Sequence, residues 1–209
     1  FPKANLTTQD VIATWSGVRP IVSSGKGLDP SKERRDHAVW ADKGVISVSG
    51  GKLTTFRQIA QDVLTAAESW LPKLKERNQK TSIFSNPSAG LSTPLNGEQY
   101  RRFIGKYGYL AQKFLAEMPV SELTIIPQTQ TLWAELRWAL RYEQVVHLDD
   151  LLLRRTRLGL LLEQGGAAHF ETIKKMALSE GWTEDKWASE QARYSAIWQQ
   201  YYSLPNSLK

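Results

Sequence analysis

One polar stretch, RNQKTSIFSNPSAGLSTPLNG at residues 77–97, divides the chain into two unequal parts. It is rich in Ser, Asn, Pro and Gly, a composition typical of a loop or linker. The sequence before it mixes β-prone runs with one helical pattern, whereas the sequence after it is helical in pattern throughout. The predicted fold class is therefore mainly α, with a small α+β remnant followed by an all-helical C-terminal domain.

The predicted domains are residues 1–76, a linker at 77–92, the helical domain at 93–203 and a tail at 204–209. A domain of the length of the helical part can bury a core of its own. The whole chain has eight tryptophans, which also indicate a real core, because a Trp ring is costly to leave in water.

The first part is expected to contain one strand near 11–16, a β-hairpin and one helix. The two β-prone pieces of HAVWADKGVISVSG flank Asp42-Lys43-Gly44, which is a hairpin signal. Apolar residues then recur at helical spacing over 53–70. Because so few elements make a poor core by themselves, we interpret this part as the edge of a larger sheet whose other strands are missing.

Apolar periodicity predicts six helices after the linker, near 97–105, 107–117, 130–143, 148–163, 166–180 and 184–202. Thr183 is the expected N-cap of the last helix. The apolar stripe of that helix has one polar break and consists of Trp187, Gln191, Tyr194, Trp198 and Tyr201.

Composition excludes several kinds of site. The chain has no cysteine, so disulfides, Cys-based zinc sites and thiol catalysis are excluded. Its three histidines lie far apart without metal-ligand spacing, and no metal site is expected. The net charge is +6, but the densest basic run, RRTRLG at 154–159, follows Asp149 and Asp150 within an apolar helix. This pattern favours a charge-paired helix over a nucleic-acid interface.

The segment VISVSGGKLTTFRQIA at 45–60 reads as a strand, two glycines and a helix. Gly50 and Gly51 would let a flat ligand approach the backbone, and the free amides of residues 51–54 at the helix N-terminus would bind an electron-rich edge such as that of a reduced flavin. The alternative is a tight turn that needs glycine for geometry only. Taken alone, the octapeptide SGGKLTTF favours that alternative.

Three cations are candidates for a phosphate site: Arg19, Arg35 and Lys52. Arg19 lies between a valine and a proline, which stiffen its backbone, and Arg35 lies at the mouth of the hairpin. If the three converge, they need a dianion among them, and guanidinium groups match phosphate oxygens. The alternative is that these are surface residues paired with nearby acidic side chains.

In order and spacing, FPKANLTTQDVIATWSGVRPIV, RRDH, ISVSGGKLTTFRQIA and HLDDLLLRRTRLGLL resemble the C-terminal half of FAD-dependent glycerol-3-phosphate dehydrogenase. The resemblance covers most of the chain, with residues 77–130 matching only loosely. It implies oxidation of sn-glycerol 3-phosphate to dihydroxyacetone phosphate by hydride transfer to FAD, with electrons passed to quinone.

The resemblance also implies roles for single residues. Arg19 and Arg35 would bind the substrate phosphate, and Lys52 would be catalytic beside the flavin and the substrate. The cofactor contacts would be made by Gly50, Gly51, Lys52, Leu53 and Thr54. The histidine proposed as the base in that family has no counterpart here.

In that family the dinucleotide fingerprint and most FAD contacts lie in the N-terminal half. FAD is therefore expected in the intact protein but not on this chain, and this fragment alone is expected to be inactive. The implied partners are glycerol 3-phosphate and quinone, without nucleic acid. A cytoplasmic location, peripheral contact with the inner membrane and a homodimer are further implications. Two alternatives stay open: a glycerophosphate oxidase that uses oxygen, and a helical interaction module with no catalytic role.

Overall fold

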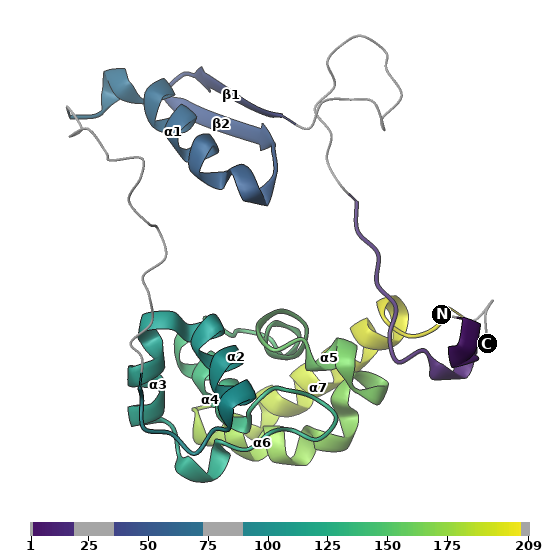
Figure 1. The fold of residues 1–209 in the computed structure, drawn as a ribbon. Helices are drawn as coiled ribbons and strands as arrows, with labels where there is room; N and C mark the ends of the chain where they lie inside the picture. The colour runs from purple at the N-terminus through teal and green to yellow at the C-terminus, as the bar shows by residue number, and fades with distance from the viewer. Residues whose placement is uncertain (1, 19–35, 73–89, 206–209) are drawn as a thin grey trace. The chain divides into compact units, whose positions relative to one another are not determined.

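The structure is a computed structural model of the chain, and it describes residues 2–18, 36–72 and 90–205. The chain forms two compact units (Figure 1). One unit combines Phe1–Trp15 with Ser82–Lys209, and the other consists of Ser16–Thr81. The predicted fold class is confirmed, because helices dominate and the described strands form one two-stranded antiparallel sheet.

The smaller unit is a β-hairpin followed by a helix. Strand β1 (His37–Asp42) pairs with β2 (Val45–Gly50) in antiparallel register, from His37 opposite Gly50 to Asp42 opposite Val45. Lys43 and Gly44 form the connecting turn with φ of 47° and 80°, the left-handed conformation that two-residue hairpin turns require. Helix α1 (Phe56–Ala66) is shorter than the pattern over 53–70, because single 3₁₀ turns precede and follow it. The predicted hairpin and helix are thus both present.

None of residues 36–72 is buried. Several large apolar side chains of this range are exposed, among them Trp40, Val45, Leu53 and Trp70. The described part of this unit therefore has no core, and its interpretation as the edge of a larger sheet stays a prediction.

The strand predicted near 11–16 is wrong. These residues pair with no strand, and Thr14 instead donates from its backbone N–H to the carbonyl of Tyr202 at 2.8 Å and from its hydroxyl to that of Ser203 at 3.0 Å. Ala13 packs against the helical core. A β-prone segment becomes a strand only beside a free strand edge, and here its partner is the end of a helix. Residues 1–15 accordingly group with the helical unit rather than with the hairpin.

The larger unit contains the helices α2 (Gly97–Tyr107), α3 (Ala111–Glu117), α4 (Trp133–Tyr142), α5 (Leu158–Leu161), α6 (Phe170–Ser179) and α7 (Glu184–Tyr201). Side chains cap two of them, as N-terminal N–H groups need partners. The side chain of Asn96 accepts from the N–H groups of Glu98 and Gln99, and the hydroxyl of Thr183 accepts from that of Lys186. The predicted cap at Thr183 is confirmed.

The single helix predicted over 148–163 is wrong. A π-helix runs from Asp150 to Arg155, and both the N–H and the hydroxyl of Thr156 donate to the carbonyl of Leu151, five residues back. Arg157 then takes a left-handed φ of 58°, which ends the helix before the short α5 begins. Residues Gln164–Gly166 also have positive φ, so the helix expected from 166 starts only at Phe170.

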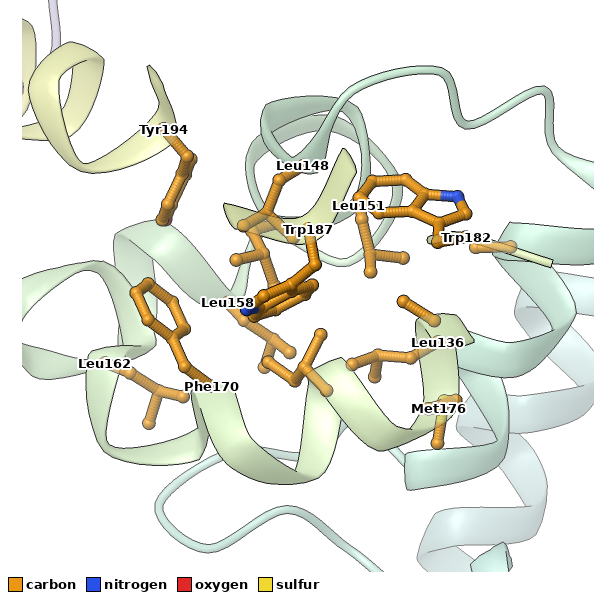
Figure 2. Close-up of a cluster of buried hydrophobic side chains, with 14 of the residues drawn as sticks. Leu136, Leu148, Leu151, Leu158, Leu162, Phe170, Met176, Trp182, Trp187 and Tyr194 are labelled. Atoms are coloured by element: carbon orange, nitrogen blue, oxygen red, sulfur yellow. The ribbon is translucent and has the colours of Figure 1, made fainter. Parts of the chain in front are cut away.

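Two hydrophobic clusters fill the helical unit, and α4 contributes to both. Leu136 and Ala139 face a cluster built from residues 126–198, whereas Ala134 and Trp138 face a cluster built from residues 95–138. Figure 2 shows Trp187 in the first cluster, with Phe170 and leucines of the 148–162 segment around it. In the described ranges, no helix is long and apolar enough to cross a membrane.

The apolar stripe of α7 is present with one exception. Trp187, Tyr194 and Trp198 are buried, and Trp187 donates from its indole to the side chain of Gln191 at 2.7 Å, which satisfies the polar break. Tyr201 is 62% exposed and does not belong to the core, because it is the last residue of α7 and no other element of the described residues covers it.

Candidate functional site

The predicted cofactor-binding residues lie together in the turn between β2 and α1. Gly50 and Gly51 have φ of 78° and 85°, a conformation that side-chain-bearing residues rarely adopt. A Cβ added to Gly51 would lie 2.8 Å from Cδ1 of Ile59 and 3.1 Å from Cβ of His37. The backbone conformation explains both glycines, and close packing inside the unit adds a second reason for Gly51.

Thr55 closes the turn. Its hydroxyl donates to the carbonyl of Lys52 at 2.9 Å, its N–H donates to the same carbonyl at 3.0 Å, and the Lys52 N–H donates weakly to its hydroxyl at 3.4 Å. The first N–H groups of a helix have no partner within the helix, and the helix dipole favours negative charge near them. The side chains of Lys52, Leu53 and Thr54 are exposed. The structure thus brings Gly50 to Thr54 together in one exposed turn before α1, and their role as cofactor contacts stays a prediction.

The sequence analysis did not identify an interaction between the first residue of β1 and α1, the helix that follows this turn. Nε2 of His37 lies 2.6 Å from Oδ2 of Asp62, and the side-chain amide of Gln58 donates to Oδ1 of the same carboxylate at 2.8 Å. The His37 side chain is only 16% exposed. The available signal was the spacing of Ile59 and Asp62, which puts both on one face of α1.

The other two predicted site residues, Arg19 and Arg35, lie outside the described residues. Their convergence with Lys52 stays a prediction. A search of the described ranges for three or more His, Cys, Asp or Glu side chains that could hold a metal ion found no such group.

A charged cluster in the helical unit is centred on Glu135, whose side chain is fully buried. It accepts hydrogen bonds from Arg102, Lys106, the hydroxyl of Tyr107 and the N–H of Leu132. Burial alone would raise the pKa of Glu135, but the hydrogen bond from Arg102 and the charge of Lys106 outweigh it and lower that pKa. Burial, followed by the Glu135 charge, raises the pKa of Tyr107. This cluster joins α2 to α4 and is structural.

A second charged cluster explains the basic run in the helical unit. Arg154 bonds to Asp149 and Asp150, and Arg193 on α7 bonds to Asp149 as well. Burial by itself would raise the pKa of Asp149, whereas the hydrogen bonds from Arg154 and Arg193 lower it. The predicted charge pairing of this run is confirmed for Arg154, and the pairs tie the π-helix to α7.

Comparison with known proteins gives a matching family model and a set of similar curated proteins. A family model described as the C-terminal domain of alpha-glycerophosphate oxidase matches residues 46–187. The chain is also similar to the aerobic glycerol-3-phosphate dehydrogenases of Staphylococcus aureus strains USA300, NCTC 8325 and MRSA252, with 27% identity over 178 residues in each case. The match covers 75% of this chain and 32% of each relative, so the chain spans about a third of their length. No solved structure matches significantly.

Proposed function

The chain belongs to the family of the C-terminal domain of alpha-glycerophosphate oxidase, and from this membership we propose that it is the C-terminal part of a flavoprotein that oxidises sn-glycerol 3-phosphate to dihydroxyacetone phosphate. The observation that best supports this proposal is the turn from Gly50 to Thr54. It lies inside the region matched by the family model, precedes the N-terminus of a helix, and has exposed side chains. The Staphylococcus aureus relatives are named glycerol-3-phosphate dehydrogenases, which supports glycerol 3-phosphate as the substrate.

In this proposal, bound FAD would supply the oxidising chemistry as the acceptor of the hydride on the carbon that carries the substrate's secondary hydroxyl, and the hydroxyl proton would go to a base such as the family's histidine, which has no counterpart in this chain. Gly50 and Gly51 would let the backbone approach the flavin closely. The N–H groups of Leu53 and Thr54 would donate hydrogen bonds to its electron-rich edge. Lys52, whose side chain is exposed in this structure, would stabilise the negative charge that develops during the transfer once the bound flavin and substrate exclude water from it.

Arg19 and Arg35 bind the phosphate of the substrate in this proposal. Paired guanidinium–phosphate hydrogen bonds are charge-assisted and hold the substrate in a fixed orientation. The orientation places the reacting carbon against the flavin, which is how binding energy at a remote group accelerates a reaction.

Quinone is the proposed electron acceptor on the basis of the resemblance; the similar curated proteins are named dehydrogenases, whereas the matched family model is named for an oxidase, so oxygen is the alternative acceptor. A quinone acceptor goes together with a cytoplasmic enzyme that contacts the membrane peripherally. The homodimer expected from the resemblance also stays a prediction.

The test is steady-state kinetics on the FAD-loaded enzyme that contains this chain. Arg19→Ala and Arg35→Ala should each lower kcat/KM for glycerol 3-phosphate by about ten- to a hundredfold, the value of one lost charge-assisted hydrogen bond. Any slow oxidation of glycerol, which has no phosphate, should hardly change. Lys52→Ala should lower kcat as well as kcat/KM.

The matched control is Arg101→Ala, which removes an exposed arginine of α2 that forms no ion pair with another described residue. It should leave both substrates unaffected. Thermal melts run in parallel detect loss of fold. If the folded Arg19→Ala enzyme keeps the wild-type kcat/KM for glycerol 3-phosphate, the phosphate site is assigned incorrectly.

A further inference from the structure

His37 lies at the meeting point of three elements of the smaller unit. It is the first residue of β1 and stands opposite Gly50, the last residue of β2, in the sheet register. Its Cβ would lie 3.1 Å from a Cβ placed on Gly51, and its ring reaches Asp62 on α1 at 2.6 Å. One residue therefore pairs with the end of β2, lies beside the glycine turn and reaches the helix that follows the turn with its ring.

Asp62 is held on both sides. Its Oδ2 faces the imidazole of His37, and its Oδ1 accepts from the amide of Gln58, four residues earlier on the same helix. A carboxylate whose two oxygens are both engaged cannot turn away without losing a hydrogen bond. It therefore fixes the ring of His37, and the ring in turn fixes where the first turns of α1 lie against the sheet.

We propose that His37, held by Asp62, is a positioning residue for the flavin-facing turn: it sets the place of the Leu53 and Thr54 amides and of the Lys52 side chain. This inference rests on the proposed function of that turn. The geometry required of a binding site is set by such outer contacts, because a group that touches the ligand is only as well placed as its support.

The support matters more here than in an ordinary domain. No residue in 36–72 is buried, so a hydrophobic core does not hold the turn in the described part of the unit. The other close packing at the turn is that of Ile59 against Gly51. The His37 side chain is 16% exposed and that of Asp62 is 41% exposed, so water reaches the hydrogen bond from the side of the carboxylate and the contact is only partly protected.

The test compares His37→Ala, His37→Gln and Asp62→Asn in the FAD-loaded enzyme that contains this chain. The control, Thr65→Ala, shortens an exposed side chain of α1. The measurements are the Kd for FAD from titration of the apoenzyme, the flavin midpoint potential and the thermal melt. None of these is a turnover rate.

We expect His37→Ala to raise the Kd for FAD about tenfold, the worth of one charge-assisted hydrogen bond. The flavin potential should become more negative, because displaced amides stabilise the reduced flavin less well. Asp62→Asn should move both quantities in the same direction. His37→Gln should recover part of each, because its amide can still donate to Asp62, and Thr65→Ala should match the wild type.

A structural staple without a positioning role gives a different result. In that case His37→Ala lowers the melting temperature while the Kd and the potential stay at wild-type values, and the inference is overturned. If His37→Ala fails to fold, Asp62→Asn, which keeps the side-chain volume, decides by the same two measurements. Failure of the proposed function is separate, since the wild-type protein itself would then neither bind FAD nor oxidise glycerol 3-phosphate.

Discussion

The buried carboxylate of Glu135 gives a direct test of how the helical unit is held together. Its side chain accepts five hydrogen bonds, two from Arg102 and one each from Lys106, Tyr107 and Leu132. In Glu135→Gln the shape is kept, but the charge is lost and an NH₂ group faces the donors of Arg102 or Lys106. The change therefore leaves cations without their counter-charge inside the fold.

The expected loss follows from burial. Removing one partner of a buried ion pair costs about 3–5 kcal/mol. Arg102 and Lys106 are 27% and 32% exposed, so water reaches them and reduces the cost. We therefore expect Glu135→Gln to lower the free energy of unfolding by about 2–3 kcal/mol. Glu184→Gln is the matched control, because Glu184 is 67% exposed in its pair with Lys174 and its loss should leave stability close to the wild-type value.

Urea denaturation followed by tryptophan fluorescence measures the difference. The buried tryptophans of the described residues, Trp138, Trp182, Trp187 and Trp198, all belong to the helical unit, so the emission shift reports on that unit. Equal urea midpoints for Glu135→Gln and Glu184→Gln would refute the reasoning, since the cluster would then contribute no more than a surface pair.

The same comparison has a pH dependence of known sign. The pKa of Glu135 is lowered in the folded protein, so its contribution is complete above the unfolded-state pKa of about 4.3 and is lost as pH falls through the folded value. The stability difference between the wild type and Glu135→Gln should therefore be largest near neutral pH and shrink in acid. A difference that grows in acid would contradict the assigned direction.

Three further outcomes are expected. A Cβ on Gly159 would lie 2.7 Å from Cδ2 of Leu153 and 3.3 Å from the carbonyl of Leu152, so Gly159→Ala should lower the free energy of unfolding by about 1–3 kcal/mol in urea titration. Gly105 lies on α2 with nothing within 4 Å of an added Cβ, so Gly105→Ala should raise the free energy of unfolding by up to about 1 kcal/mol. The isolated chain should not retain FAD, because it has no GxGxxG phosphate site, and flavin absorbance in stoichiometric amount with the purified chain would contradict this.

Elements governed by local chemistry were predictable from the sequence. The hairpin followed from a turn in which Gly44 tolerates positive φ, and the start of α7 followed from the Thr183 cap. The break in the predicted helix over 148–163 was not predictable in this way, because its leucines continue the apolar pattern without a proline. The break depends on the Thr156 hydroxyl reaching the Leu151 carbonyl. Sequence periodicity does not distinguish that turn from an α-helical one.

Long-range pairing explains the remaining differences. The cations of α2 lie about 30 residues from Glu135 in sequence, and His37 lies 25 residues from Asp62. A pattern of single residue types carries no information about such partners. The sequence of α2 shows a pair of cations at Arg102 and Lys106, one helical turn apart, which repel each other weakly and are favoured by a negative charge nearby, but nothing in it identifies Glu135 as that charge. Likewise, the β-prone run at 11–16 specifies extended backbone but not which element it meets.

The two units differ in how strongly their own residues stabilise their conformation. This difference determines how substitutions near the proposed site should act. In the helical unit, buried polar side chains such as Glu135 are fully paired, and no buried side-chain polar atom of the described residues lacks a partner. The glycine turn lies in the other unit, where no described residue is buried. Its conformation therefore depends on a few polar contacts, above all that of His37 with Asp62, and on whatever surface the turn contacts when it binds. A site built this way is expected to respond to substitutions behind the turn through ligand affinity and redox potential before it responds through unfolding, because little else in the unit is lost when the turn shifts.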